Sequence, residues 1–391
     1  MGKGKIDVKN TMQAHSQAKV DFYKYYLERY MAILCQSKYI KHVRVYDVFC
    51  GMGVYDNGGK GSPVVAYDTI KELYTTHKIT NNNTKISLII NDISDKRIEK
   101  VKEYIDSNKH AYCEVRSYNL EIGQLFGLII PEINKTTNDT RNLVFIDPYG
   151  YKDIRKELLL NLMENGRTEV ILFLPISHMQ RFTNVALQDD DEKTQYEPLR
   201  DFVYSFFSDL NHPIRLGTVG VKDYIRFVAD ALKFEDNYFA TSYYVERDKS
   251  NCFALFFMSA HIFGFEKILE TKWVLDEEHG GGFNLPKKQN LIPEIEEEFA
   301  DRAKRENASR LKSILNKELN NRPHTNKEIY ELVLRKEFLP KHANEVLREM
   351  QQNHLLSVID IANGKNARKN AFYLTYKDYK KDPVVEISIK R

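Results

Sequence analysis

Cysteine is scarce in this chain: there are four among 391 residues, and no two of them form a C-x-x-C pair. This scarcity argues against a disulfide framework and a zinc knuckle, so no metal site is expected, and it favours a reducing, cytoplasmic setting. Long hydrophobic runs are missing too. The longest apolar stretch, Val170 to Ile176, is far shorter than the ~20 residues that span a bilayer. Residues 1–10 carry lysines with no apolar run behind them, so residues 1–14 are expected to form a flexible arm and not a secretory signal.

The overall composition is that of an ordinary globular protein, with 42% hydrophobic and 29% charged residues. It excludes collagen-like, mucin-like and disordered chains. The charges are divided unevenly, because residues 301–391 carry 20 Lys and Arg against 12 Asp and Glu, whereas residues 1–300 carry 38 against 43. A basic C-terminal module follows from this division. The excess of positive charge in this module has two interpretations: the module contacts nucleic acid, or its lysines are simply solvated at the surface.

The order of the periodic segments predicts a doubly wound α/β domain over residues 15–275. An amphipathic helix from His15 to Gln36 is followed by alternating strand and helix signals, which are typical of βαβ units in a mostly parallel sheet. Two later strand-like runs, 238–246 and 253–259, predict an antiparallel hairpin at the sheet edge. The expected parallel strands are 43–49, 86–90, 112–115, 143–146 and 169–174.

A second domain is expected over residues 301–391, after a linker at 276–300 that contains three consecutive glycines. Thr325 and Glu328 have the spacing of a capping box at the start of a helix. A further helix is expected from Pro340 to Asn353, followed by strand-like runs at 355–361 and 371–376 around a basic tip. Helices followed by a hairpin in this order predict a winged helix-turn-helix domain.

Basic side chains of this second domain are candidates for nucleic-acid contact. They are Lys341, His342 and Arg348 on the expected recognition helix, and Lys365, Arg368 and Lys369 on the wing. If the helix enters a major groove, the wing residues meet phosphates. Winged helices also serve as protein-docking domains, and the sequence supports the two interpretations equally.

Three motifs follow three strands of the predicted sheet. The glycine-containing loop 46–53 follows the first strand, Asp92 follows the second, and Asp147 with its neighbours follows the fourth. Because the carboxyl ends of parallel strands share one edge of a sheet, these motifs are expected to border one crevice. Taken singly, each also has a plain structural interpretation as a tight turn, a helix cap and a turn, respectively.

The chemistry of the motifs nevertheless fits a nucleotide-like ligand. Glycines let backbone amides approach a ligand, and an acidic residue after the second strand accepts hydrogen bonds from ribose hydroxyls. At the third motif, a carboxylate beside a proline and an aromatic ring can accept a hydrogen bond from an exocyclic amine and stack its base. His178, after the fifth strand, is a weaker candidate, since a lone histidine is more often structural.

Together these stretches resemble the class I S-adenosylmethionine-dependent methyltransferases and, more narrowly, the three-Cys-motif partner proteins. The matching stretches are His15 with Lys19, 46–53, 61–66, 145–150 and 263–265. The resemblance implies a Rossmann-like methyltransferase sheet (doubly wound, with an antiparallel edge hairpin) and a C-terminal winged helix. It also implies a cysteine-rich, radical-S-adenosylmethionine-like partner protein.

The resemblance implies S-adenosylmethionine as the cofactor and a nucleic-acid base amine as the methyl acceptor. The implied cofactor residues are Asp47, Phe49, Gly51, Gly53, Asp92 and Asn119, with Asp92 at the ribose and Asn119 at the adenine edge. The implied catalytic residues are Asp147, Pro148 and Tyr149.

One position departs from the amino-methyltransferase pattern. That motif is Asp-Pro-Pro followed by an aromatic residue, whereas this chain has Gly150 between Tyr149 and Tyr151. The departure supports a second interpretation, in which the protein is a catalytically inactive adaptor with a methyltransferase fold or a DNA-binding regulator.

Overall fold

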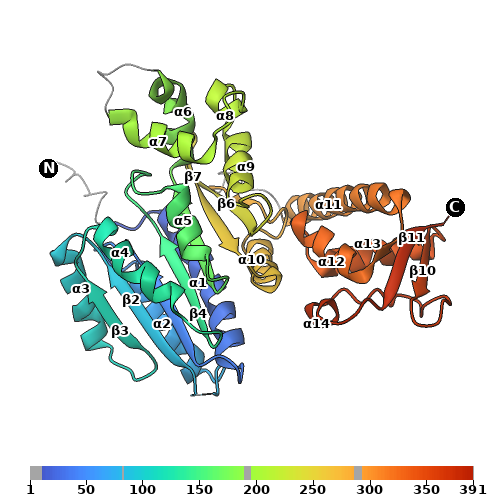
Figure 1. Cartoon of the computed structure of the whole chain (residues 1–391), viewed down its shortest axis with the longest axis horizontal. Helices are drawn as coiled ribbons and strands as arrows, with labels where there is room; N and C mark the ends of the chain where they lie inside the picture. Colours follow the sequence, from blue (N-terminus) through green and yellow to red (C-terminus); the bar gives the residue numbers. More distant parts are fainter. Residues whose placement is uncertain (1–10, 82, 189–194, 286–292, 391) are drawn as a thin grey trace. The chain divides into compact units, whose positions relative to one another are not determined.

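The computed structural model describes residues 11–81, 83–188, 195–285 and 293–390 (Figure 1). The chain divides into two compact units. The N-terminal unit consists of Met1–Lys267 and Gly281–Leu285, and the C-terminal unit of Ile268–Gly280 and Pro286–Arg391. Within the described ranges, no helix combines the length and the apolar character that crossing a bilayer requires.

An eight-stranded sheet forms the centre of the N-terminal unit, in the order β3-β2-β1-β4-β5-β7-β6-β8. The first five strands are parallel, and β7 lies antiparallel between β5 and β6. Parallel strands covered on both faces are nearly continuous apolar runs, which is why the sequence predicts them. The strands are β1 (His42–Asp47), β2 (Lys85–Asn91), β3 (Glu114–Tyr118), β4 (Thr140–Ile146), β5 (Thr168–Leu174), β6 (Phe239–Asp248), β7 (Asn251–Ser259) and β8 (Gly282–Phe283). The predicted fold class is confirmed in its architecture: a doubly wound, Rossmann-like sheet with an antiparallel hairpin toward one edge.

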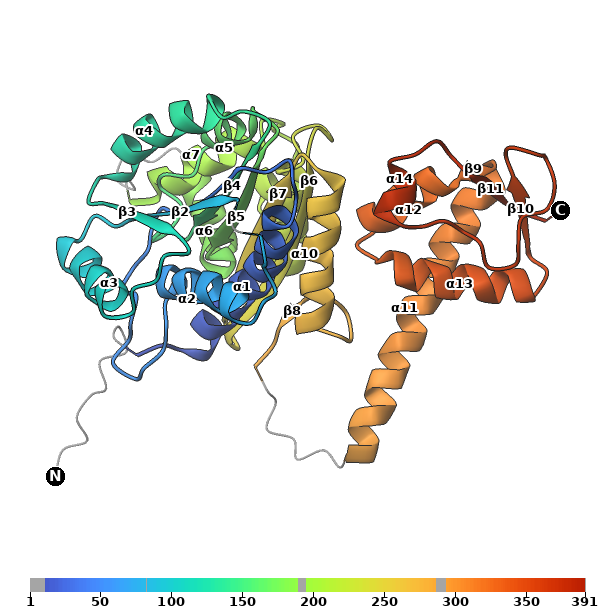
Figure 2. The same ribbon diagram turned by 90° about the horizontal axis from the view of Figure 1, so that it is seen from below.

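Helices cover both faces of this sheet (Figure 2). On one face lie α1 (Ala14–Cys35), α2 (Ser62–Thr75) and α3 (Asp95–Ser107), and on the other lie α4 (Ile122–Asn134) and α5 (Lys156–Met163). Between β5 and β6 the chain forms α6 (Ile176–Leu187), α7 (Glu197–Phe206), α8 (Pro213–Leu216) and α9 (Val221–Ala231), and α10 (Ile262–Leu275) follows β7. Of the expected arm 1–14, residues 1–10 lie outside the described residues. The main chain of Met12 is tied to the Asn57 side chain by two hydrogen bonds of 3.2 Å.

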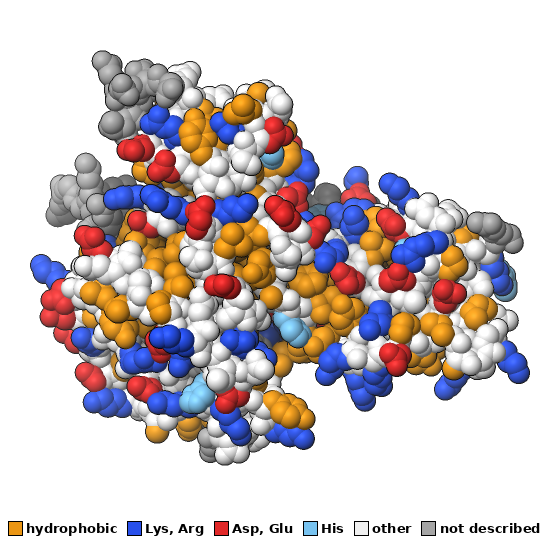
Figure 3. Space-filling view, viewed as in Figure 1, with side chains coloured by type: hydrophobic (Ala, Val, Ile, Leu, Met, Phe, Trp, Pro, Cys, Tyr) orange, Lys and Arg blue, Asp and Glu red, His pale blue; other side chains and the backbone are white. Residues whose placement is uncertain are grey.

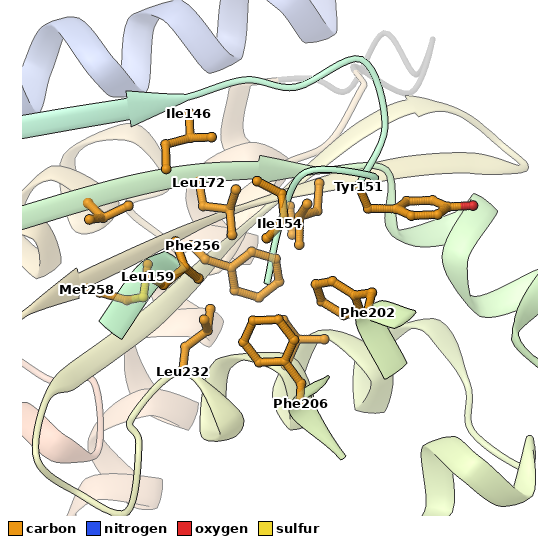
Figure 4. Packing of buried hydrophobic residues seen from close by; sticks show 14 of the residues in the cluster. Ile146, Tyr151, Ile154, Leu159, Leu172, Phe202, Phe206, Leu232, Phe256 and Met258 are labelled. Atoms are coloured by element: carbon orange, nitrogen blue, oxygen red, sulfur yellow. The ribbon is translucent and has the colours of Figure 1, made fainter. Parts of the chain in front are cut away.

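The main core lies between the sheet and the helices that follow β5. Leu172 and Phe256 of the sheet belong to one buried cluster with Phe202 and Phe206 of α7 (Figure 4). Tyr151 lies in the same cluster, and its hydroxyl points away from it (Figure 4). Tyr151 therefore fixes the loop after β4 to the core while keeping a polar atom outside the core.

The C-terminal unit combines helices with a three-stranded sheet of order β10-β11-β9. Its elements are α11 (Pro293–Asn321), β9 (His324–Thr325), α12 (Asn326–Arg335), α13 (Pro340–Gln352), β10 (Leu356–Asp360), α14 (Tyr376–Tyr379) and β11 (Val385–Ile389). The predicted capping box is present, since the main-chain N–H of Glu328 donates to Thr325 Oγ1 at 3.3 Å and the N–H of Thr325 donates to the Glu328 carboxylate at 2.8 Å. Helix α11 begins inside the range 276–300 that the sequence assigns to a linker.

The wing differs from the prediction in its second strand. Residues 371–376 form no strand, and β10 instead pairs antiparallel with β11, with Val358 opposite Ile387. The physical reason is that Val385 and Ile387 alternate with polar residues and are fully buried, so β11 offers the apolar face that the sheet needs. Residues 361–384 therefore form one long loop between the paired strands, and this loop contains α14.

Candidate functional site

The register of β1 brings three acidic residues to one edge of the sheet. Asp47, the last residue of β1, is paired with Ile90 in β2 and with Phe145 in β4. Asp92 and Asp147 therefore each lie two residues beyond the level of Asp47, on the two neighbouring strands. With a strand spacing of about 4.8 Å and a rise of about 3.3 Å per residue, each lies about 8 Å from Asp47 between Cα atoms.

The loop after β1 is tied to the end of β2. The Cys50 N–H donates to the main-chain oxygen of Asn91 at 2.8 Å, and the Gly51 N–H donates to Asp92 Oδ2 at 3.1 Å. A further main-chain bond of 2.6 Å from Gly61 to Gly53 closes the loop before α2. These bonds hold the loop in one conformation at the carboxyl edge of the sheet.

Two glycines of this loop have backbone conformations that favour glycine, and one of them also lacks room for a side chain. Gly51 and Gly53 have φ values of +63° and +69°, in the left-handed region that disfavours side chains. A Cβ on Gly53 would also lie 2.5 Å from Val101 Cγ2, whereas a Cβ on Gly51 would meet nothing within 4 Å. The space in front of Gly51 is therefore open.

Asp47 is a buried carboxyl group without a partner. Its side chain is 0% exposed, and neither carboxyl oxygen has a hydrogen-bond partner among the described residues. Burial raises the pKa of Asp47 to about 7, and the negative charge of Asp147 raises it further. The Ser62 hydroxyl is close enough to lower this pKa, although its position does not meet the geometry of a hydrogen bond. Because an uncompensated buried carboxyl group is costly, a ligand group with a positive charge or an N–H would stabilise this site.

Asp92 differs from Asp47 because protein groups surround its carboxylate. Besides Gly51, the Ser94 N–H donates to Oδ1 at 2.8 Å and Arg97 Nη1 lies 3.4 Å from both oxygens. The Arg97 guanidinium also lies over the Tyr149 ring, 4.9 Å from its centroid. Arg97 thus connects the residue expected at the ribose with a residue expected at the acceptor.

The two remaining cofactor candidates, Asn119 and Phe49, differ in their surroundings. Asn119, in the loop after β3, donates from Nδ2 to the main-chain oxygen of Asp92 at 2.8 Å. Phe49 is half-buried and packs against the main core. All six candidates therefore lie in or beside the loops that follow β1, β2 and β3.

Asp147 is paired with a lysine from the leading helix. Lys19 Nζ of α1 donates to Asp147 Oδ2, and the same ammonium lies 5.0 Å from the centroid of the Phe173 ring. Burial lowers the pKa of Lys19, but the neighbouring Asp147 carboxylate outweighs this effect and holds the pKa above its usual value. Lys19 is therefore charged at neutral pH. The sequence singles out Lys19 only through the resemblance, because a contact across 128 residues leaves no local signal.

A cavity of about 490 Å³ opens beside the Asp147 motif, at the ends of β4 and β5 and the start of β7. Tyr149, Gly150 and Tyr151 line it together with His178 and Arg247. His178, the weaker candidate from the sequence, hydrogen-bonds through Nδ1 to the Tyr151 hydroxyl at 3.2 Å. His178 is exposed, but the protein covers part of its ring, and this partial desolvation lowers the pKa of His178, so the imidazole is neutral at pH 7.

Five of the six basic candidates of the C-terminal unit are exposed. They are Lys341 and Arg348 on α13 and Lys365, Arg368 and Lys369 in the loop 361–384. Lys and Arg side chains also gather along the edge of this unit where α14 lies (Figures 1 and 3).

His342, the sixth basic candidate, does not project from α13 as expected. Its ring lies 4.5 Å from that of Trp273 between centroids, and its Nδ1 accepts the Leu339 N–H at 3.2 Å. Burial lowers its pKa to about 4. His342 caps the start of α13 and packs against α10, so it serves the structure of the unit.

Comparison with known proteins finds methyltransferases and a winged-helix family. Residues 284–362 match the family model described as GMT-like wHTH domain. Curated proteins yield no match. The chain is similar to the bifunctional kinase-methyltransferase WbdD, with 12% sequence identity and a TM-score of 0.33. The similarity covers 62% of this chain, which spans only 39% of the length of WbdD. It is also similar to an O-methyltransferase from Bacillus cereus in complex with SAH, with 12% identity over 61% of this chain and 80% of that chain and a TM-score of 0.31. A third similar structure is the O-methyltransferase TomG from Streptomyces achromogenes in complex with SAM, with 14% identity over 65% of this chain and 91% of that chain and a TM-score of 0.31.

Proposed function

We propose that this protein binds S-adenosylmethionine at the loop 46–53 and transfers its methyl group to an amine of a nucleic-acid base. The observation that carries the proposal is the buried carboxyl group of Asp47, which makes no hydrogen bond among the described residues and lies at the end of β1, directly before the loop in which Gly51 has open space in front of it. S-adenosylmethionine has an ammonium group and a sulfonium, so its positive charge complements the carboxyl group of Asp47. The ammonium group is the natural partner for Asp47.

S-adenosylmethionine supplies an activated methyl group, so the protein mainly has to align the acceptor. Lys19 occupies one oxygen of Asp147, which leaves the other oxygen to accept a hydrogen bond from the acceptor amine. The main-chain oxygen of Pro148 already accepts the Gly150 N–H at 2.8 Å and keeps its second lone pair for the same amine. The Tyr149 side chain, 73% exposed, offers a ring on which the base can stack.

The basic loop 361–384 supports nucleic acid as the source of the acceptor. Its exposed Lys365, Arg368 and Lys369 can pair with phosphates without regard to base sequence. In this proposal the C-terminal unit holds the nucleic acid while the N-terminal unit carries out methyl transfer.

Two measurements test the proposed function together. Calorimetry should detect binding of S-adenosylmethionine, and transfer of labelled methyl groups should be seen with single-stranded DNA or RNA. Asp147→Asn keeps an oxygen for Lys19 but loses the negative charge, so we expect at least a hundredfold slower transfer with cofactor affinity changed less than threefold. Asp147→Ala should abolish transfer. Unchanged turnover in both variants would remove Asp147 from the mechanism.

A second candidate function is a binding protein that uses the methyltransferase fold without catalysis. The observation in its favour is that Gly51, Ser94 and Arg97 already surround the Asp92 carboxylate, which is 2% exposed. A ribose would have to displace Arg97 to reach it. Absence of binding by both S-adenosylmethionine and S-adenosylhomocysteine at millimolar concentration would favour this candidate.

We also propose a three-Cys-motif, radical-S-adenosylmethionine-like protein as a partner. The resemblance of the stretches quoted from the sequence supports this assignment. Size-exclusion chromatography of the two purified proteins tests it, and elution of the mixture as two separate species would contradict it.

A further inference from the structure

The two parts of the N-terminal site differ in their charged side chains. At the cofactor side, the carboxyl groups of Asp47, Asp92 and Asp147 face the cations of Lys19 and Arg97. The neighbouring cavity of about 490 Å³ is lined by Lys152 and Arg247, and no carboxylate is among the described residues that line it. The carboxyl groups of the cofactor side suit a positively charged cofactor. The cavity has cations without carboxylates on its wall and so suits an anion.

Arg247 is available to such an anion. Its closest described carboxylate, Asp248, lies 4.0 Å from Arg247 Nε, and both side chains are about half-exposed. Asp248 Oδ1 also accepts the main-chain N–H groups of Ser250 and Asn251, at 2.9 and 3.0 Å. The carboxylate thus stabilises the turn between β6 and β7, and the guanidinium remains only weakly neutralised.

The aromatic side chains at the cavity differ in how much of each ring is accessible. The Phe253 ring is stacked with both His15 and Phe173, at centroid distances of 5.4 and 4.9 Å. Tyr149 has Arg97 over its ring but is still 73% exposed, so it keeps an open surface for a planar group. A planar ligand would therefore stack on Tyr149.

The hydrogen-bonded pair formed by Tyr151 and His178 supplies polar atoms on the cavity wall. The Tyr151 hydroxyl points away from the core (Figure 4). His178 is exposed. A hydroxyl and a neutral imidazole can each donate and accept, so the pair can bond the edge of a heterocycle.

We propose that this cavity binds a single nucleotide, with its phosphate on Arg247 and its base on Tyr149. The proposal rests on the proposed function and names the class of its acceptor. Cavities of roughly 300–1,000 Å³ enclose one small molecule, so the nucleotide must be unpaired or flipped out of a duplex. The planar fork of an arginine matches two phosphate oxygens, which makes Arg247 the residue that distinguishes a nucleotide from a nucleoside.

Calorimetry on the full-length protein without S-adenosylmethionine tests this proposal. The probes are 5′-AMP, 5′-CMP, 5′-GMP and 5′-UMP and the four matching nucleosides. At least one nucleotide should bind ten times more tightly than its nucleoside. Arg247→Gln should remove that difference and leave the affinity for the nucleoside unchanged. Lys249→Gln is the matched control, because Lys249 is exposed on the same turn, is not among the residues lining the cavity, and should behave as wild type.

Three results would overturn the proposal: no binding of any nucleotide at millimolar concentration, equal affinity for nucleotide and nucleoside, or equal losses in the two variants. Binding of 4-hydroxybenzoate instead of a nucleotide would assign the cavity to an aromatic acid. Cofactor binding is measured in a separate titration. A protein that binds S-adenosylmethionine but no nucleotide would contradict only this proposal, and one that binds a nucleotide but no S-adenosylmethionine would contradict the proposed methyl transfer.

Discussion

Glu169, in β5, is another buried carboxyl group of the N-terminal unit. The Tyr26 hydroxyl donates to Oε2, and the Ser259 hydroxyl donates to Oε1 at 3.0 Å. Burial raises the pKa of Glu169 from 4.5 to about 7, although these two hydrogen bonds oppose the shift. The folded state binds the proton of Glu169 more tightly than the unfolded state does. The contribution of the protonated Glu169 side chain to the free energy of unfolding is therefore complete below pH 4.5 and is lost as the pH rises through about 7.

We therefore expect Glu169→Gln, which keeps the shape of the side chain, to remove this part of the pH dependence. At pH 4 the variant and the wild type should have similar free energies of unfolding, and at pH 8 the variant should be more stable by roughly 3 kcal/mol. Chemical denaturation followed by circular dichroism at both pH values measures the difference. Glu103→Gln on the exposed face of α3 serves as control and should change neither value. If the free energy of unfolding changed with pH in the same way in Glu169→Gln and in the wild type, Glu169 would not have a raised pKa in the folded protein.

At the scale of single elements, the loop after β1 offers a matched pair of substitutions. Gly51→Ala and Gly53→Ala both place a side chain at positive φ, which costs about 1 kcal/mol each. Only the second also forces a methyl group against Val101, and overpacking of this kind costs about 1–3 kcal/mol more. Thermal unfolding should therefore show a clearly larger loss of stability for Gly53→Ala. Equal losses would mean that the loop moves freely away from α3.

The elements that the sequence predicts well are those whose pattern is local. Buried parallel strands and the capping box of Thr325 fall in this class. Helix α4 is not among the elements expected from the sequence, because Gly123, Gly127 and Pro131 interrupt its helical signal. The second wing strand is misplaced because only long-range pairing distinguishes 371–376 from Val385–Ile389.

The same distinction applies to the candidate site. Strand ends, and hence Asp47, Asp92 and Asp147, can be placed on one edge from the βαβ pattern alone. The contacts of Lys19 and Arg97 depend on how α1 and α3 pack, which the pattern does not contain. His342 shows the reverse error: a histidine on a basic helix suggests a surface role, but packing against Trp273 makes it structural.

At the scale of the whole molecule, the charge division gives the C-terminal unit its own measurable role. Residues 301–391 carry 20 Lys and Arg against 12 Asp and Glu, and Lys365, Arg368 and Lys369 of the loop 361–384 are exposed. Each phosphate that such a residue neutralises releases condensed counterions, so binding weakens as salt rises. We expect full-length protein with these three residues changed to Gln to bind a labelled single-stranded oligonucleotide more weakly, and the slope of log affinity against log salt to fall by about 2.

Fluorescence anisotropy between 50 and 300 mM salt measures this slope, and a triple variant of equal net charge separates a local contact from a general charge effect. The control changes Lys96, Lys100 and Lys102, which are exposed on α3 of the N-terminal unit, to Gln. It should keep the wild-type slope, because residues that meet no phosphate release no counterions. If the variant with Lys365, Arg368 and Lys369 changed to Gln had the same slope of log affinity against log salt as the control, the loop 361–384 would make no phosphate contact. The winged-helix unit would then be assigned to protein docking.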